Sequence, residues 1–373
     1  MRHSGSFGGK RANRAVRPDG RRASTRHTAS VGHARPEFRG NAHPSLTVVV
    51  VRSTAPMTAP AELLVVVGPT GSGKTALAMA LAERLDGEVV SADSVQIYRR
   101  FDLGSGKPTA AERDHVAHHC IDQIDPLDPM DAALFAELAD GAIADITARG
   151  RRAIVCGGTF LWVRALLYGL APAPPADPTV RQRHAAIVAR DGRQALHDAL
   201  AAVDPEAARR LAPNDVVRVS RALEVHEISG ITLSAWQAAH GFRSIRYPAR
   251  LIGIRHSSET LDHLIADRIT AMLGAGWVQE VEALLADGLG EARPMRSVGY
   301  RQIADDLTGV RAPNDADLKT RIFRATRVFA RRQRTWLRDQ PVRWLTPPEA
   351  ATLRPALVTE LAAPAEYLEV PPG

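Results

Sequence analysis

The sequence is short of several residue types, and each shortage narrows what the protein can be. Its 373 residues include only two cysteines, Cys120 and Cys156, which excludes a disulfide framework and a four-cysteine zinc site and fits a reducing cytosol. The thirteen histidines show no metal-ligand spacing. No apolar run approaches the roughly 18 residues of a membrane span. We therefore expect a cytoplasmic protein.

Lysine is scarce as well. Only four of the 48 basic residues are lysine, and two of them, Lys74 and Lys107, fall inside the motifs described below. Because the chain uses arginine almost everywhere else, a retained lysine indicates a position that needs a compact point charge.

The formal charge of +7 is unevenly distributed. Residues 1–56 carry 11 basic and 2 acidic side chains, a net of +9, so the rest of the chain carries 37 basic and 39 acidic side chains, a net of −2. This extension is rich in Arg, Gly, Ser, His and Pro, and is predicted to be disordered. It is either a nucleic-acid-binding tail, a targeting peptide, or an untranslated stretch before a start at Met57. The total charge alone therefore does not indicate nucleic acid.

Strand and helix patterns alternate in the first half of the chain. The apolar run 63–67 predicts a buried strand, followed by a helix over 75–85. Two more strands are predicted over 88–92 and 153–156, separated by a helix over 132–149. This order predicts an α/β fold with a P-loop NTPase-like parallel sheet core, a helical insertion and C-terminal helices.

The predicted domain organisation follows from these patterns. Residues 57–178 form the first part of the core, and residues 179–241 a helical insertion. Residues 242–345 form the second part of the core with an Arg-rich helix, and 346–373 a loosely ordered tail. The elements predicted in the second part are a strand over 249–254 and helices over 259–288 and 316–338.

The segment Gly68–Thr75, GPTGSGKT, is a complete P-loop between a strand and a helix. Its glycines let backbone N–H groups converge on phosphate oxygens, and the helix N-terminus adds its dipole. Lys74 bridges phosphate oxygens, and Thr75 offers a hydroxyl to Mg²⁺. The pattern is typical of nucleotide-binding and ATP-binding proteins, but it shows only that a di- or triphosphate is bound. The predicted phosphate-binding residues are Gly68, Pro69, Thr70, Gly71, Ser72, Gly73, Lys74 and Thr75.

Asp93 stands at the end of the second strand. In P-loop NTPases an apolar strand usually ends in an acidic Mg²⁺ residue, but here the third strand ends in Gly157-Gly158-Thr159. A carboxylate at the carboxyl end of a parallel strand faces the ligand crevice. Asp93 is therefore either a general base near the phosphates or a helix N-cap. Gly157-Gly158-Thr159 by itself fits a tight turn, and His118-His119 fits a turn rather than a site.

Arginines in the second half point toward RNA. Arg218 and Arg221 share a helix face, and either they contact phosphate or RNA, or Arg221 forms an exposed ion pair with Glu224. Residues 319–343 carry nine basic side chains against one acid, Asp339, a net of +8, with aromatic side chains interleaved. This helix is either a solvated face or a surface on which unpaired bases stack.

Taken together and in order, these motifs resemble the tRNA dimethylallyltransferase (tRNA isopentenyltransferase) family from about residue 63 to 338. The resemblance implies transfer of a dimethylallyl group from dimethylallyl diphosphate to the exocyclic amine of the adenosine 3′ to the tRNA anticodon. The P-loop would then hold a diphosphate rather than hydrolyse ATP. The matching segments are GPTGSGKT at 68–75, SADSVQIY at 91–98, GSGKP at 104–108, GGT at 157–159, DVVRVSRALE at 215–224, VGYRQ at 298–302 and ARRQRTWLR at 330–338.

The resemblance also implies roles for residues. Asp93 would be the general base, and an arginine, Arg218 or Arg221, would stabilise the leaving pyrophosphate. Mg²⁺ would bind at Thr75, and the insertion would grip the anticodon stem–loop of one tRNA on a monomeric enzyme. The implied catalytic residues are Asp93, Thr70, Arg218 and Arg221. The implied tRNA contacts are Asp93, Ser94, Val95, Gln96, Thr159, Arg181, Val217, Arg218, Val219, Ser220 and Arg221.

Two other functions fit part of the sequence. A small-molecule kinase would use ATP at the same P-loop, but it would need neither the Arg-rich helix nor the Gly-Gly-Thr strand end. A non-catalytic RNA-binding protein would have no need for an intact Lys74, Thr75 and Asp93.

Overall fold

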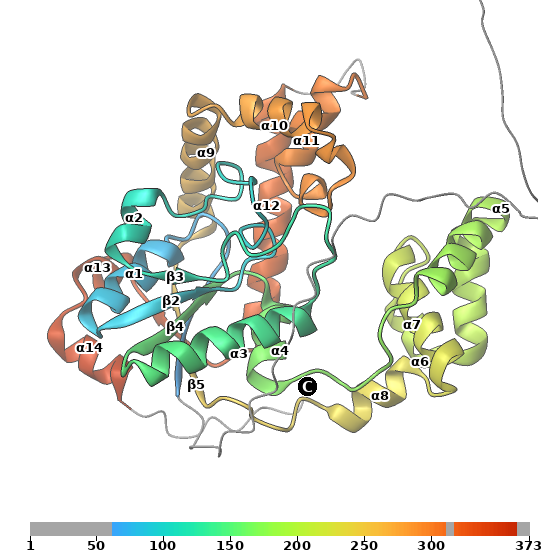
Figure 1. The fold of residues 1–373 in the computed structure, drawn as a ribbon, viewed down its shortest axis with the longest axis horizontal. Helices are drawn as coiled ribbons and strands as arrows, with labels where there is room; N and C mark the ends of the chain where they lie inside the picture. The colour runs from blue at the N-terminus through green and yellow to red at the C-terminus, as the bar shows by residue number, and fades with distance from the viewer. Residues whose placement is uncertain (1–61, 311–316, 364–373) are drawn as a thin grey trace, which may run out of the picture. The chain divides into compact units, whose positions relative to one another are not determined.

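The computed structural model describes residues 62–310 and 317–363, so the basic extension predicted over 1–56 lies outside the described residues. The described part is built on a six-stranded parallel sheet with the order β3-β2-β4-β1-β5-β6 (Figure 1). This confirms the predicted α/β core. The strands are β1 (Leu63–Val67), β2 (Gly87–Ser91), β3 (His118–His119), β4 (Arg152–Gly157), β5 (Ala249–Ile254) and β6 (Val342–Leu345).

Helices cover both faces of the sheet because alternate strand residues point to opposite sides. Leu63, Val65 and Val67 of β1 belong to one apolar cluster, and Leu64 and Val66 belong to the other. The first cluster includes α3 (Ala132–Ala148), α4 (Phe160–Tyr168), α9 (Ser258–Gly274), α10 (Trp277–Ala286), α11 (Tyr300–Leu307) and α12 (Leu318–Leu337). The second includes α1 (Lys74–Arg84), α13 (Pro347–Thr352) and α14 (Pro355–Ala362) (Figure 1).

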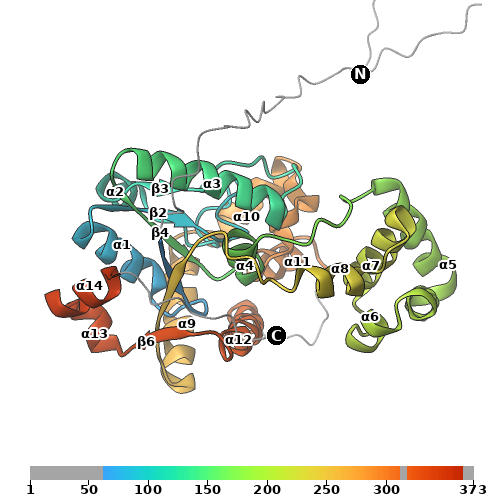
Figure 2. The same ribbon diagram turned by 90° about the horizontal axis from the view of Figure 1, so that it is seen from below.

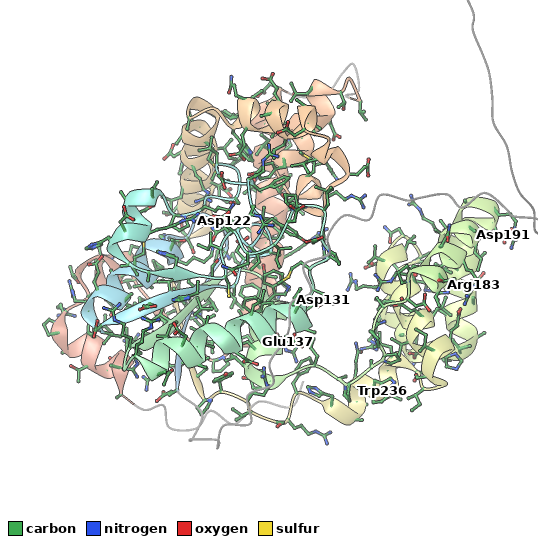
Figure 3. All side chains as sticks on the ribbon, in the orientation of Figure 1. Asp122, Asp131, Glu137, Arg183, Asp191 and Trp236 are labelled. Atoms are coloured by element: carbon green, nitrogen blue, oxygen red, sulfur yellow. The ribbon has the colours of Figure 1, made fainter. Side chains whose placement is uncertain are left out.

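Residues 178–240 form a helical group with an apolar cluster of its own (Figure 2). Its longest element, α5, is interrupted at Gly192, whose φ of 87° is not helical. Arg183 on α5 and Trp236 on α8 lie in this insertion (Figure 3). The helices are α5 (Pro178–Val203), α6 (Pro205–Arg210), α7 (Val216–Ser229) and α8 (Leu233–His240). The remaining elements are α2 (Ala110–His115), η1 (Leu289–Glu291) and η2 (Arg293–Arg296).

Three sequence expectations need correction. His118-His119 is not a turn but the short edge strand β3, which pairs with β2. The segment at 342–345 is the opposite edge strand, β6, which the sequence pattern did not predict. The tail from 346 was expected to be loosely ordered, yet α13 and α14 pack Leu353, Leu357 and Leu361 into the second cluster. An apolar residue every third or fourth position is enough to anchor both short helices.

No helix of the described residues has the length and apolar composition needed to cross a membrane.

Candidate active site

The P-loop lies between β1 and α1, as the sequence predicts. Gly71 and Gly73 have φ angles of 81° and 83°, in the left-handed region that glycine adopts at little cost. Gly73 is the N-cap residue of α1, and no side chain caps this helix. The first-turn N–H groups of α1 therefore have no side-chain acceptor and point at the position where a phosphate would bind.

Three charged groups meet beside the P-loop. Lys74 interacts electrostatically with Asp93 and with Arg268 of α9, and Arg268 with Asp93. Burial is the main cause that lowers the pKa of Lys74. Two cations facing one carboxylate leave the group with an excess of positive charge, which suits a polyanionic ligand.

A small pocket joins these groups to the ends of β2 and β4. It is lined by Lys74, Thr75 and Asp93, and by His118 of β3. The Nδ1 of His118 is 2.7 Å from the Val116 carbonyl oxygen, and its buried Nε2 has no hydrogen-bond partner in the described part of the chain. Burial lowers the pKa of His118. A neutral imidazole therefore presents an acceptor nitrogen to the pocket.

Asp93 closes a turn with one of its carboxylate oxygens. Its Oδ1 accepts hydrogen bonds from the N–H groups of Val95 at 2.9 Å and Gln96 at 3.2 Å. Its Oδ2 has no hydrogen bond or ion pair to any described residue. Among the described residues no helix begins directly after Asp93, so the helix N-cap alternative is wrong: one oxygen closes a turn, while the other remains available as a base.

The segment after Asp93 is held by side chains that the sequence motifs contain. The Ser94 N–H donates to Thr159 Oγ1 at 3.1 Å, which joins the ends of β2 and β4. The amide of Gln96 donates to the Gly106 carbonyl at 3.0 Å. Lys107, only 2% exposed at its side chain, donates to Asp122 at 2.5 Å in the loop after β3 (Figure 3). This retained lysine acts as a buried point charge that fixes the loop.

A single side chain links the Arg-rich helix α12 to the catalytic loops. Gln333, 5% exposed, accepts a hydrogen bond from the Thr70 N–H at 2.8 Å and donates to the Gly158 carbonyl at 3.0 Å. A β-carbon on Gly158 would lie 2.4 Å from the Gln333 amide nitrogen, so a larger residue there would displace this amide. The tight turn expected at Gly157-Gly158-Thr159 is thus a contact point for α12.

A pocket of about 660 Å³ lies between α12, the start of α9 and the ends of β5 and β6, with Pro69 of the P-loop at its edge. Among its arginines, Arg327 forms an ion pair with Asp262, whereas Arg331 and Arg338 pair with no acid among the described residues. The other basic side chains that line it are Arg255, His256 and Arg334. The pocket is suited to an anion.

The structure does not bring Arg218 or Arg221 into the group of charges beside the P-loop. Both lie on α7, where Arg218 pairs with Asp215 and Arg221 pairs with the buried Glu224 at 2.6 Å. Arg181 of α5 pairs with the same Glu224 at 2.9 Å. Arg221 therefore forms the ion pair with Glu224 that the sequence offered as one alternative. The arginine that interacts with Lys74 and Asp93 is Arg268, which the sequence analysis did not identify.

The other predicted tRNA contacts of α7 differ in exposure. Val217 is 80% exposed and Arg218 is exposed, so both are accessible to a partner. Val219 is fully buried in the cluster of the insertion, which corrects the expectation that its side chain contacts RNA. The Ser220 hydroxyl lies 2.8 Å from Nδ1 of the buried His184. Val219 and Ser220 therefore hold α7 against α5.

Two family models match the sequence of this chain. The one described as "IPP transferase" matches residues 96–340, and the one described as "Isopentenyl transferase" matches residues 61–125. A tRNA dimethylallyltransferase of Sorangium cellulosum is 63% identical over 290 residues, 78% of this chain and 92% of that protein. Another, of Anaeromyxobacter dehalogenans, is 51% identical over 292 residues, 77% of this chain and 95% of that protein.

Solved structures have the same fold. The full-length tRNA isopentenylpyrophosphate transferase of Bacillus halodurans superposes with a TM-score of 0.58 at 33% identity, covering 80% of this chain and 96% of that one. A eukaryotic dimethylallyltransferase acting on tRNA superposes with a TM-score of 0.63 at 24% identity, covering 77% of this chain and 74% of that one.

Proposed function

The chain belongs to the tRNA dimethylallyltransferase family and prenylates tRNA, and from this premise we propose the complete reaction and its residues. A dimethylallyl group moves from dimethylallyl diphosphate to the exocyclic amine of the adenosine 3′ to the anticodon, and diphosphate is released. The observation that carries the proposal is the free Oδ2 of Asp93 beside two cations and the P-loop.

The diphosphate is held by the P-loop. Backbone N–H groups at the start of α1 and the Lys74 ammonium bind its oxygens. Arg268 takes the role that the sequence suggested for Arg218 or Arg221, because Arg268 is the arginine that interacts with Lys74 and Asp93. As the carbon–oxygen bond breaks, negative charge collects on the departing diphosphate, and these donors stabilise it.

The residues present fit Mg²⁺. The small pocket offers the Thr75 hydroxyl, a hard oxygen ligand of the kind that Mg²⁺ prefers. Thr75 would hold it, and when bound it neutralises charge on the diphosphate.

Asp93 Oδ2 is the base. As the amine nitrogen forms its bond to the dimethylallyl carbon, that carbon's bond to the diphosphate oxygen breaks, and the surplus proton on nitrogen passes to Asp93 Oδ2. The target base has to leave its stack to reach this oxygen. The turn that Oδ1 closes keeps Oδ2 in one orientation throughout the reaction.

The tRNA is bound by the strand ends, the insertion and α12. Ser94, Gln96 and Thr159 surround the base, while the exposed Val217 and Arg218 of α7 and the unpaired arginines of α12 contact the RNA. Arg181, Val95 and Arg221 support these surfaces. We place the enzyme in the cytoplasm as a monomer.

The test is direct. Purified protein is incubated with Mg²⁺, dimethylallyl diphosphate and unmodified tRNA. Nucleoside mass analysis is expected to show one adenosine per tRNA that carries a dimethylallyl group on its exocyclic amine. Phosphate release from ATP without a modified nucleoside would instead favour the kinase. Replacing Arg268 with Gln is expected to lower kcat for the transfer about tenfold, the value of one charge-assisted hydrogen bond made to the departing diphosphate, while Arg218→Gln leaves kcat unchanged. The reverse pattern would return the leaving-group role to α7.

A further inference from the structure

Arg164 of α4 is a cation that the reaction described above does not use. It lies five residues after Thr159 and is half-buried. Its guanidinium carbon is 3.8 Å from the ring centroid of Phe242, in the segment that returns from the insertion, and 6.0 Å from that of Trp336 on α12. Three separate parts of the chain therefore meet at this side chain.

Arg164 has neither an ion pair nor a hydrogen bond to any described residue, although burial lowers its pKa. Arg246, which contacts backbone carbonyls of α4, differs from Arg164 because it has an acidic partner. Arg246 donates to Asp140 at 2.5 Å and to the Leu166 carbonyl at 3.0 Å, and Tyr247 binds the other oxygen of Asp140 at 3.0 Å. Both oxygens of Asp140 therefore already have partners. Partial burial of a guanidinium without an anion costs free energy. No described residue offers the N–H donors of Arg164 an acceptor that would offset this cost.

The aromatic side chains around Arg164 are held in place from two sides. Phe242 has a φ of 51°, an uncommon conformation for an aromatic residue, and its N–H donates to His240 Nδ1 at 3.2 Å. Trp336 stacks on Phe160 with ring centroids 4.4 Å apart and planes 5° from parallel. The stacking on Phe160 holds the Trp336 ring, and the contact with His240 holds the backbone of Phe242. The platform under Arg164 is therefore preorganised.

The same face of α4 carries an exposed apolar side chain. Leu161 is three residues before Arg164, so the two lie on one side of the helix, and Leu161 is 57% exposed. A cation with free N–H donors, framed by aromatic rings and an exposed leucine, has the chemistry that binds an unpaired nucleotide. The guanidinium would bind the phosphate, and the apolar side chains would pack against the face of the base.

We propose that Arg164, with Leu161 and Phe242, binds an unstacked nucleotide of the tRNA loop next to the target adenosine. The inference rests on the proposed function, because tRNA is the partner that supplies the nucleotide. The ligand is RNA rather than the prenyl donor, since α4 begins at the Gly-Gly-Thr turn and Arg164 is absent from the charges around Lys74.

The experiment measures binding of unmodified tRNA to the full-length protein over a series of salt concentrations. Arg164→Gln is expected to weaken binding about tenfold and to reduce the slope of log K against log salt by about 0.7, the value for one phosphate of a single strand. Arg164→Lys should keep the slope but lose part of the affinity, because it keeps the charge without the planar fork. Arg151→Gln is the matched control, since it removes one half-exposed arginine that pairs with Asp86 and Glu88 at the amino end of β4, away from the Gly-Gly-Thr turn.

Several readouts separate the outcomes. The KM for dimethylallyl diphosphate and the melting temperature of Arg164→Gln should stay at the values of the unaltered protein. An unchanged tRNA affinity and salt slope, or the same change in Arg151→Gln, would overturn the role of Arg164. If the unaltered protein modifies tRNA, and Arg164→Gln binds tRNA with the same affinity and salt slope, the inference fails and the proposed function stands. If the unaltered protein binds no tRNA, both fail.

Discussion

Replacing Asp93 with Asn separates the two roles that the structure gives to this side chain. Oδ1 closes the turn at Val95 and Gln96, and Oδ2 is free to accept a proton. Asparagine retains a carbonyl oxygen for the turn but has no basic oxygen. Asp93→Ala loses both functions, so the pair of variants distinguishes a base from a backbone cap.

The expected magnitudes differ clearly. Loss of a positioned general base lowers the rate by about 10²- to 10⁴-fold, which corresponds to about 3–5 kcal/mol of activation free energy. Loss of a side-chain cap costs about 0.5–2 kcal/mol of folding free energy. Asp93→Asn should therefore retain the melting temperature and lose turnover, whereas Asp93→Ala should lose turnover and some stability.

The assay is single-turnover transfer from labelled dimethylallyl diphosphate to unmodified tRNA, together with tRNA binding and thermal unfolding for each variant. Binding of tRNA should stay within a few-fold for Asp93→Asn, because the turn that positions Ser94 is intact. Turnover by Asp93→Asn within threefold of the unaltered protein would refute the assignment of the base. Equal loss of stability in both variants would refute the claim that Asn preserves the turn.

Three further predictions concern helix α12 and the far end of β2. Gln333→Met should raise the KM for the donor and lower the unfolding free energy by about 2–5 kcal/mol in urea titration, because two buried backbone groups lose their partner. Replacing Arg331 and Arg332 together with Gln should weaken tRNA binding and lower its salt slope by about 1.8 if each contacts one duplex phosphate. The pKa of Glu88 is depressed, first by its hydrogen bond with Arg149, so its stabilising contribution should be complete above about pH 4.3 and diminish as pH falls. Glu88→Gln should lose stability at pH 6 and show a flatter decline toward pH 3.

Each of these has a contrary result. A donor KM unchanged in Gln333→Met would show that the contact to the P-loop is only structural. An unaltered salt slope would remove the α12 arginines from the RNA interface. Parallel acid titrations of the unaltered protein and Glu88→Gln would show that other carboxylates cause the acid sensitivity.

Much of the catalytic half could be predicted from the sequence because its signals are local. The P-loop occupies eight consecutive residues between a strand and a helix, and Asp93 stands two residues after the end of β2. By contrast, β6 is four residues long and lies at an edge, with an exposed arginine in its centre, so no alternation identifies it. The two-residue strand β3 gives even less pattern.

The site residues that sequence reasoning missed depend on tertiary contacts. Gln333 lies 263 residues from Thr70, and nothing in its own neighbourhood indicates that it reaches the P-loop. Arg268 is one of many arginines on amphipathic helices. Only the packing of α9 places it beside Lys74 and Asp93. Arg218 and Arg221 were chosen because of a motif, whereas the structure shows both paired with acids of the same helix or its cap.

The bridge made by Gln333 has a thermodynamic consequence. One amide connects the P-loop to the helix whose exposed arginines we propose to contact RNA. If occupancy of the P-loop shifts this bond, the affinity of α12 for its partner changes, and linkage requires an equal reciprocal change in donor affinity. Two substrates that do not touch the same residue would then bind cooperatively, and the coupling free energy should disappear when that amide is removed.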